Sequence, residues 1–480
     1  MKEWKNSEFV PLHVHSDYSQ FDGLAPIKKL VLRARELGFP AIALTDHGNV
    51  GGIIKLIKEC NSKMTKDEND LPIPHPYPTI KSILGCEMYF SGSRLWKSKK
   101  EQVDAQKGNR HLNLFAKNFL GYQNLCHLSE KSWTEGFYFD PRIDFDILAS
   151  HSEGLMCSSA CLGSLINANL LYDRYDTAKE VCGIFKDIFK EDFFLEIMYH
   201  GIPEEKLILG DIVKLGKEMS IPLIATNDTH YVNKDQGSSH EVFMCMSTSS
   251  CITNPKHLKF PYDEFYLKNA SEMAKMFSGI PEAIHNTVEF ASRIDDTDIS
   301  KKLFGGMKLP KFDIPDEFKV TSNEFEDKFR YLKHLVAIGM KKKGWEDSPD
   351  HLKQLEIELE DTRVAWENNG YDFATYFLIE ADIMKFANDS GILTGAGRGS
   401  GYASIILHCL NICYGTDPLK HGLIWERFLG FDSRQFIKAE DFGFEEEFDI
   451  SKLIDAKDDS GDDLDSERSL EDDLGGVDRY

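Results

Sequence analysis

The first 230 residues contain short apolar runs that alternate with amphipathic stretches, and this alternation limits the possible folds more than any other feature. The runs that we interpret as buried strands are residues 9–15, 41–45, 83–89, 111–117, 154–161, 193–197 and 221–230. Apolar residues recur at helical spacing in the intervening stretches 27–37, 51–60, 162–171, 176–189 and 204–219. Strands that alternate with helices predict parallel strands with crossover helices, and so either an α/β barrel or a doubly wound sheet.

Side chains that can bind a metal occur at or near the ends of these strands. His13 and His15 point the same way, because alternate residues of a strand share a face. The full set of candidate ligands is His13, His15, Asp22, His47, Glu87, His111, Cys161, Asp228 and His230. In α/β folds the functional groups gather at the carboxyl ends of the strands. Core packing does not require ligand-type side chains at these places, so the set predicts a metal site.

The composition of this set indicates which metals would bind. Nitrogen and oxygen donors with one sulfur suit Zn²⁺, Mn²⁺ or Fe²⁺ better than Ca²⁺ or Mg²⁺. The candidate ligands exceed the needs of one ion, so we expect two or three ions that share a bridging carboxylate or histidine. Such clusters polarise phosphate oxygens and make hydroxide from water near neutral pH, which indicates phosphoester hydrolysis. Cys157 lies close enough in the chain to compete with Cys161 for the sulfur position.

Several of these stretches resemble a known family. Residues 13–19, 44–48, 85–87 and 225–231 resemble the polymerase-and-histidinol-phosphatase (PHP) domain, in the form that opens the alpha subunits of the C family of bacterial replicative DNA polymerases. Residues 111–118, 134–138 and 265–268 extend the resemblance, which runs from about residue 9 to residue 294. It implies a distorted (βα)7 barrel over a first domain of residues 1–295. In some members this domain is a metal-dependent 3′–5′ exonuclease, and in others it has lost ligands and serves as a scaffold.

A glycine-rich turn is the main motif of the second domain, which we place at residues 296–440. The turn at 395–401 follows a predicted short strand at 392–394 and precedes an apolar helix at 403–410. Backbone amides of such a turn and the N-terminus of the helix can bind phosphate, and Arg398 and Ser400 add side-chain donors. An ordinary tight turn is the alternative, because the pattern matches neither a P-loop nor a dinucleotide fingerprint.

Residues 376–379, 395–401, 417–419 and 426–429 resemble the beginning of the palm in the same polymerase family. This resemblance implies that Arg398, Gly399 and Ser400, together with Arg427, bind the triphosphate of an incoming dNTP. The family's palm continues with aspartates that hold two Mg²⁺ ions for nucleotidyl transfer, and no such run follows here. We therefore expect a partial palm that polymerises, with Mg²⁺, only when a C-terminal polymerase fragment complements it.

The charge of the chain is uneven. The net charge is −23, and residues 441–480 alone contain 16 Asp and Glu against 4 Lys and Arg. This acidic, low-complexity tail is predicted to be disordered, and it makes the global charge a poor guide to the partners of the rest. The 10 cysteines are scattered singly, and no apolar run is long enough to span a bilayer. These features favour a cytoplasmic location without a membrane segment.

Three functions are consistent with these patterns. A fragment of a replicative DNA polymerase accounts for both motif sets, with DNA, dNTP, a complementing fragment and other replisome subunits as partners. A stand-alone metallophosphatase acting on a small phosphoester accounts for the first domain but leaves the second without a purpose. A non-catalytic replisome scaffold is the third, and it would contain no Zn, Mn or Fe.

Overall fold

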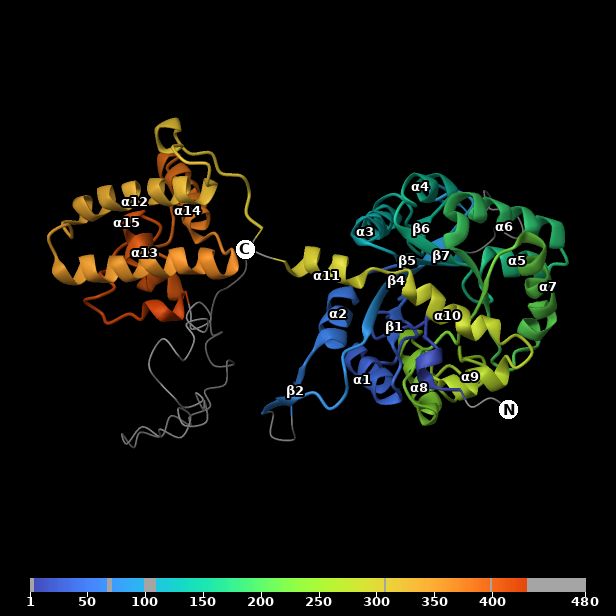
Figure 1. Ribbon diagram of the computed structural model, residues 1–480. Helices are drawn as coiled ribbons and strands as arrows, with labels where there is room; N and C mark the ends of the chain where they lie inside the picture. The colour runs from blue at the N-terminus through green and yellow to red at the C-terminus, as the bar shows by residue number, and fades with distance from the viewer. Residues whose placement is uncertain (1–3, 67–70, 99–108, 306–307, 398, 430–480) are drawn as a thin grey trace. The chain divides into compact units, whose positions relative to one another are not determined.

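The computed structural model describes residues 4–66, 71–98, 109–305, 308–397 and 399–429 (Figure 1). The chain divides into two compact units, Met1–Gly305 and Gly306–Tyr480. Helix α11 (Asp296–Phe304) belongs to the first unit, whereas the sequence interpretation places the boundary before it, at residue 295. The predicted acidic tail at 441–480 lies outside the described residues.

The first unit is built on a seven-stranded sheet in the order β1-β4-β5-β7-β8-β9, with β6 beside β4. Its strands are β1 (Ala41–Leu44), β4 (Lys81–Phe90), β5 (Arg110–Ala116), β6 (Arg142–Ile143), β7 (Leu155–Ser158), β8 (Phe193–Ile197) and β9 (Leu223–Ala225). The predicted α/β class is confirmed, but the expectation of parallel strands is wrong at β5, which runs antiparallel to β4 and β7. The described residues between β4 and β5 contain no helix, and antiparallel neighbours need no crossover.

The predicted strand at residues 9–15 is an extended segment that hydrogen-bonds on both sides. The amides of Ala43 and Thr45 donate to the carbonyls of Pro11 and Val14, at 3.0 and 2.8 Å. On the other side, Val14 forms a parallel bridge with Thr229, and the His15 amide donates to the Thr229 carbonyl at 2.7 Å. The segment therefore connects β1 to the residues that follow β9, and the sheet curls.

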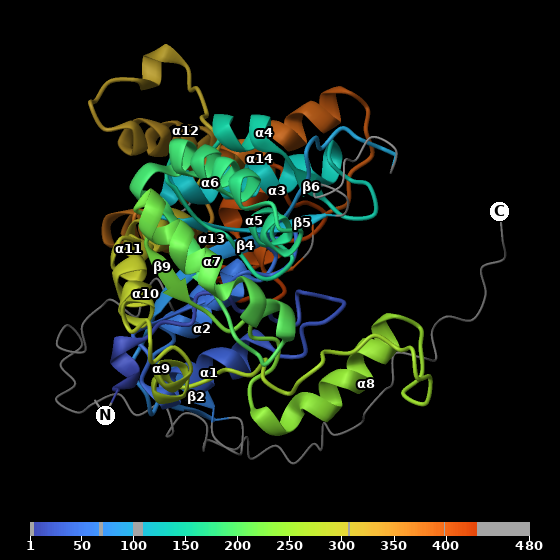
Figure 2. The ribbon, with the colours of Figure 1, turned by 90° about the vertical axis from the view of Figure 1, so that its right-hand side faces the viewer.

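Helices cover the sheet, as the two views in Figures 1 and 2 show. The helices of this unit before α11 are α1 (Ile27–Leu37), α2 (Ile53–Asn61), α3 (Phe119–Thr134), α4 (Phe145–Ser150), α5 (Leu165–Leu171), α6 (Tyr175–Phe189), α7 (Pro203–Met219), α8 (Gly237–Ser247), α9 (Ala270–Met276) and α10 (Glu282–Ser292). Of these, α8 projects away from the sheet (Figure 2). A separate hairpin pairs β2 (Met64–Lys66) with β3 (Pro72–Pro74).

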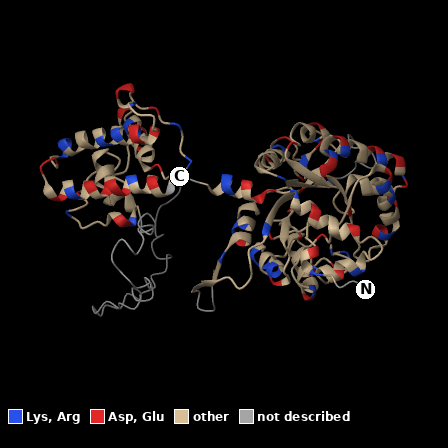
Figure 3. Ribbon diagram, viewed as in Figure 1, with Lys and Arg blue, Asp and Glu red and all other residues tan. Residues whose placement is uncertain are grey.

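Both faces of the sheet are buried, which explains why the strands read as continuous apolar runs. Along β1, Ile42 and Leu44 belong to one hydrophobic cluster, whereas Ala41 and Ala43 belong to another that includes Phe290 of α10. Figure 3 shows charged residues mainly on the helices, with strands that carry few of them. The polar side chains that do lie on or beside the strands are therefore exceptional, and they form the site described below.

The second unit contains only helices among residues 308–397 and 399–429. They are α12 (Glu324–Lys343), α13 (Pro349–Asn369), α14 (Phe373–Asp389), α15 (Ile405–Cys409) and the short 3-10 turns η5 (Asp316–Phe318), η6 (Ser400–Ala403) and η7 (Trp425–Arg427). The predicted strand at 392–394 is wrong: Leu393 is fully exposed, and no described strand of this unit could pair with it. No helix of the described residues is both long and apolar enough to cross a membrane.

Candidate metal centre

All nine predicted ligands lie in one contiguous cluster of the first unit. His13 and His15 come from the extended N-terminal segment, and Asp22 comes from the turn after it. Glu87 lies in β4 and His111 in β5. The residues that follow β1, β7 and β9 contribute, in that order, His47, Cys161, and the pair Asp228 and His230. Convergence of strand ends thus brings together residues from the whole length of the unit.

The Glu87 carboxylate is the centre of this cluster. Its oxygens lie 3.3 Å from Nε2 of His13, 2.8 Å from Nδ1 of His47 and 3.0 Å from Nδ1 of His111. The thiol of Cys161 is 3.6 Å away from the same carboxylate. Glu87 is almost completely buried, so these donors replace water around it.

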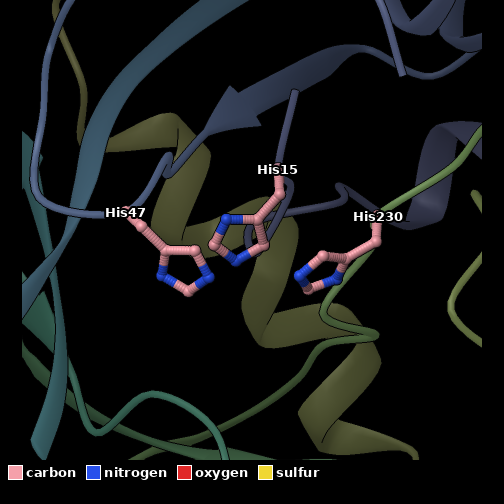
Figure 4. Close-up of side chains that lie close together, drawn as sticks. All are labelled: His15, His47 and His230. Carbon is pink, nitrogen blue, oxygen red and sulfur yellow. The ribbon is translucent and has the colours of Figure 1, made fainter. Parts of the chain in front are cut away.

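Two aspartates complete the ring of contacts. Oδ1 of Asp228 lies 3.3 Å from Nε2 of His13 and 3.1 Å from Nε2 of His15. Oδ2 of Asp22 lies 3.3 Å from Nε2 of His47 and 3.8 Å from Nε2 of His230. Figure 4 shows the rings of His15, His47 and His230 directed toward one another.

The electrostatics of the cluster require positive charge. Burial by itself raises the pKa of Glu87, but His111, His13 and His47 bring that pKa well below its usual range. Burial lowers the pKa of His13, yet Asp228, Glu196 and Glu87 together raise it well above its ordinary value. Carboxylates crowded in a site closed to water must be balanced by protonated histidines or by divalent cations.

Several buried atoms of the cluster point to cations rather than protons. Oε2 of Glu87, Oδ1 of Asp228, Nδ1 of His47 and Nε2 of His230 have no hydrogen-bond partner among the described residues, although neighbouring donors and acceptors lie close. Groups that could hold an ion, with all ligand atoms within 4.8 Å of one another, are His15–His47–His230, His13–His15–Glu87 and His47–Glu87–His111. Short contacts without hydrogen-bond geometry fit shared ligation of metal ions.

A buried glutamate that the sequence analysis missed orients His13. Glu196 of β8 lies 3.0 Å from Nδ1 of His13 and also accepts bonds from Asn113 Nδ2 (2.8 Å) and Thr226 Oγ1 (2.7 Å). Burial raises the pKa of Glu196, but His13 and the hydroxyl donors bring it below its usual value, so the group stays ionised. A carboxylate only accepts, so Nδ1 of His13 carries the proton and Nε2 is left to face the cluster.

His15 is oriented through a hydroxyl. Its Nδ1 lies 2.9 Å from Oγ of Ser19, which donates to the buried carboxylate of Asp46 at 2.8 Å. Asp46 also accepts bonds from the Ser16 amide and hydroxyl, at 2.7 and 2.8 Å. The signal for both supporting carboxylates was present in the sequence: Glu196 interrupts the apolar run of β8, and Asp46 directly precedes His47.

The predicted triphosphate site of the second unit has a different environment from the one expected. Arg398 lies outside the described residues; Gly399 has a φ of 69°, Ser400 is exposed, and Arg427 is an exposed residue of η7. The buried carboxylate of Glu358 accepts bonds from the amides of Ile405 and Ile406, at 2.8 and 3.1 Å. The N-terminus of α15 is therefore occupied by a side chain of this unit rather than open to phosphate.

Comparison with known proteins places both units. Residues 11–200 match the family model of the PHP domain, and residues 330–445 match that of the bacterial DNA polymerase III alpha NTPase domain. The DNA polymerase III subunit alpha of Borreliella burgdorferi is 39% identical over 452 residues, which cover 93% of this chain and 36% of the relative. The corresponding subunit of Treponema pallidum is 35% identical over 453 residues, 94% of this chain and 36% of the relative.

The same relation holds for the DNA polymerase III subunit alpha of Campylobacter jejuni, which is 35% identical over 88% of this chain and 35% of its own length. The chain thus spans about a third of the length of the curated relatives that it matches. The chain carries a PHP domain followed by a polymerase III alpha NTPase-type domain, and it corresponds to the N-terminal portion of bacterial DNA polymerase III alpha subunits.

Proposed function

We propose that this chain is the N-terminal part of a DNA polymerase III alpha subunit that acts in DNA replication, and that its PHP domain is a metal-dependent 3′–5′ exonuclease. The observation that carries the proposal is the cluster around Glu87, in which ligand-type side chains from nine positions meet and leave buried donor atoms unsatisfied. A scaffold that had lost its metal would gain nothing from keeping this cluster, because unbalanced buried charge destabilises a fold.

The residues of the cluster would share two or three ions of Zn, Mn or Fe. Glu87 and Asp228 each contact several histidines, which suits them to bridge neighbouring ions. Bound there, the ions would polarise the phosphate and lower the pKa of water. In the proposed reaction the oxygen of water bonds to the terminal phosphorus, the bond from phosphorus to the penultimate 3′ oxygen breaks, and that oxygen takes a proton. A mononucleotide leaves.

The residues around the cluster would position these groups. Glu196 holds the proton on Nδ1 of His13, and Ser19 with Asp46 holds His15, so both Nε2 atoms would be free to bind ions. We infer further that the curled sheet is the distorted (βα)7 barrel of this family. The second unit would be the beginning of a palm, in which Arg398, Gly399, Ser400 and Arg427 bind dNTP. Polymerisation would need Mg²⁺ and a complementing fragment.

The experiment is metal analysis joined to degradation of a 3′-labelled DNA strand. Protein purified without chelators should contain Zn, Mn or Fe and release mononucleotides from the 3′ end. His13→Ala should lose both metal and activity. His127→Ala is the matched control, because His127 is a half-exposed histidine of α3 outside the cluster.

Each alternative predicts a different result. A stand-alone metallophosphatase would hydrolyse small phosphomonoesters and leave DNA 3′ ends intact. A scaffold would contain no transition metal. Extension of a primed template by this chain alone, with dNTP and Mg²⁺, would contradict the proposed partial palm.

A further inference from the structure

Exposed aromatic side chains gather beside the metal centre. Trp133, at the end of α3, is 51% exposed, and Phe137 in the following turn is 47% exposed. Their rings are stacked with centroids 5.5 Å apart and planes 14° apart. Groups of large exposed apolar rings are uncommon on a protein surface and mark interaction sites. We call Trp133 and Phe137 the aromatic platform.

The platform is attached to the loop that carries a metal ligand. Nε1 of Trp133 donates to the carbonyl of Gly48 at 2.9 Å, and Gly48 follows His47 directly. The Gly48 amide in turn donates to the carbonyl of Glu87 at 2.9 Å. The Trp133 side of the platform is thus hydrogen-bonded to Gly48, the neighbour of the candidate ligand His47, and Gly48 is hydrogen-bonded to the candidate ligand Glu87.

The platform is held rigidly rather than carried on a loose loop. The fully buried Arg142 donates through Nε to the carbonyl of Gly136 at 3.0 Å, between the two platform residues. A Cβ at Gly136 would lie 1.9 Å from the Arg142 carbonyl oxygen, so only glycine fits. Phe139, which is 71% exposed, has a φ of 65°, a left-handed conformation that phenylalanine rarely adopts. Strain of this kind is typical of functional segments.

The acidic residue between the two platform residues is paired with cations. The acidic side chain nearest in the chain, Glu135, is paired with Arg94 and Lys131, both at 3.0 Å. Its negative charge is therefore balanced. Glu135 therefore adds little repulsion of a phosphate backbone that lies on the platform.

We propose that the aromatic platform stacks a base of single-stranded DNA and so directs the 3′-terminal phosphodiester into the metal centre. This inference rests on the proposed exonuclease function and names how that site holds its substrate. Stacking suits an enzyme that must accept any 3′ end, because every base has a π face and stacking does not read sequence. Because the platform is already held in place, less conformational entropy is lost when the DNA strand binds to it.

The test measures binding without catalysis, on the full chain in EDTA. The probe is a fluorescein-labelled oligothymidylate of about ten nucleotides. A second, otherwise identical probe carries abasic residues at the two 3′-terminal positions. Trp133→Ala should weaken binding of the oligothymidylate about 5- to 150-fold, the range for loss of one stacked base. Trp133→Phe should restore most of the affinity. Phe304→Ala, which removes an aromatic ring of α11 that is 49% exposed, should have no effect.

The abasic probe separates stacking from other effects of the substitution. Removing the bases should weaken binding to the unsubstituted chain by the same factor and should weaken binding to Trp133→Ala little. Equal losses in both proteins would overturn the platform, as would unchanged affinity in Trp133→Ala and Phe137→Ala.

A separate measurement tests the proposed function. Hydrolysis of bis(4-nitrophenyl) phosphate by the metal-loaded unsubstituted chain reports on the metal centre without a base to stack. Hydrolysis of this probe without any base-dependent binding of the oligonucleotide refutes the platform alone. Base-dependent binding without hydrolysis of either substrate refutes the exonuclease alone.

Discussion

Replacing Glu196 by glutamine tests whether the carboxylate behind His13 controls the metal centre. One oxygen of Glu196 accepts bonds from the Ser158 hydroxyl and from Asn113, and the other accepts from Thr226 and His13. Glutamine has nearly the same shape, but it brings an NH₂ group in place of one oxygen. In either orientation of the amide, its NH₂ group faces two hydrogen-bond donors, either Ser158 and Asn113 or Thr226 and His13.

The expected cost follows from these contacts. Glutamine removes an ionised acceptor from a completely buried pocket and leaves donors unsatisfied. A hydrogen bond to a charged group contributes about 1.5–3 kcal/mol, so we expect Glu196→Gln to lower the free energy of unfolding by about 3 kcal/mol. The imidazole of His13 is also freed to take the other tautomer, in which Nε2 carries the proton. Loss of such a supporting carboxylate weakens metal binding about 10- to 100-fold.

Calorimetric titration of the EDTA-treated chain with Mn²⁺ measures the affinity, and urea unfolding measures the stability. Glu205→Gln is the matched control, because Glu205 is also a buried glutamate bonded to a histidine, His200, at 2.7 Å, outside the cluster. It should lose stability but keep its affinity for metal. The reasoning is refuted if Glu196→Gln binds Mn²⁺ as tightly as the unsubstituted chain, or if Glu205→Gln weakens binding equally.

Three further outcomes are expected. Burial raises the pKa of Glu358 from 4.5 to about 7, so the stability that its protonated form contributes is complete below pH 4.5 and is lost as the pH rises through 7. This pH dependence amounts to about 3 kcal/mol and should be visible in the hydrogen exchange rates of the α15 amides. Glu358→Gln should abolish it. Chelation should lower the melting temperature of the first unit, because a metal at 100 times its Kd stabilises by about 2.7 kcal/mol, and an unchanged melting curve would contradict metal binding. Gly121→Ala should cost about 3 kcal/mol in urea unfolding, since its Cβ would lie 1.7 Å from the Gly154 carbonyl oxygen; equal stability would show that the backbone yields.

Local patterns were sufficient to predict most elements and the candidate ligands. Apolar periodicity predicted the helices that became α1, α6 and α7, and the ligand-type residues stood out because they end or interrupt apolar runs. The pattern failed where pairing decides the structure. The run at 392–394 is as apolar as a strand, but a strand needs a neighbour, and none of the described residues of its unit provides one.

Other features could not be predicted because their partners are far apart in the chain. Glu196 interrupts the apolar run of β8, which marks it as unusual, but its partner His13 lies 183 residues away and cannot be identified from local sequence. The orientation of β5 depends on a connection without a described helix rather than on the residues of the strand. In the second unit, Glu358 occupies amides 47 and 48 residues away, at a helix N-terminus that looked available for phosphate.

The sequence by itself determined which side chains are of types that can bind a metal and that most of them stand at or near strand ends, because both properties depend on residue type and near neighbours. Only the tertiary structure decided that Glu87 lies at the centre of the cluster and that Glu196 and Asp46 orient His13 and His15. It also decided that Trp133 donates a hydrogen bond to the loop that carries His47. These arrangements depend on how a curled sheet brings distant strand ends together, and local patterns contain no information on such distances.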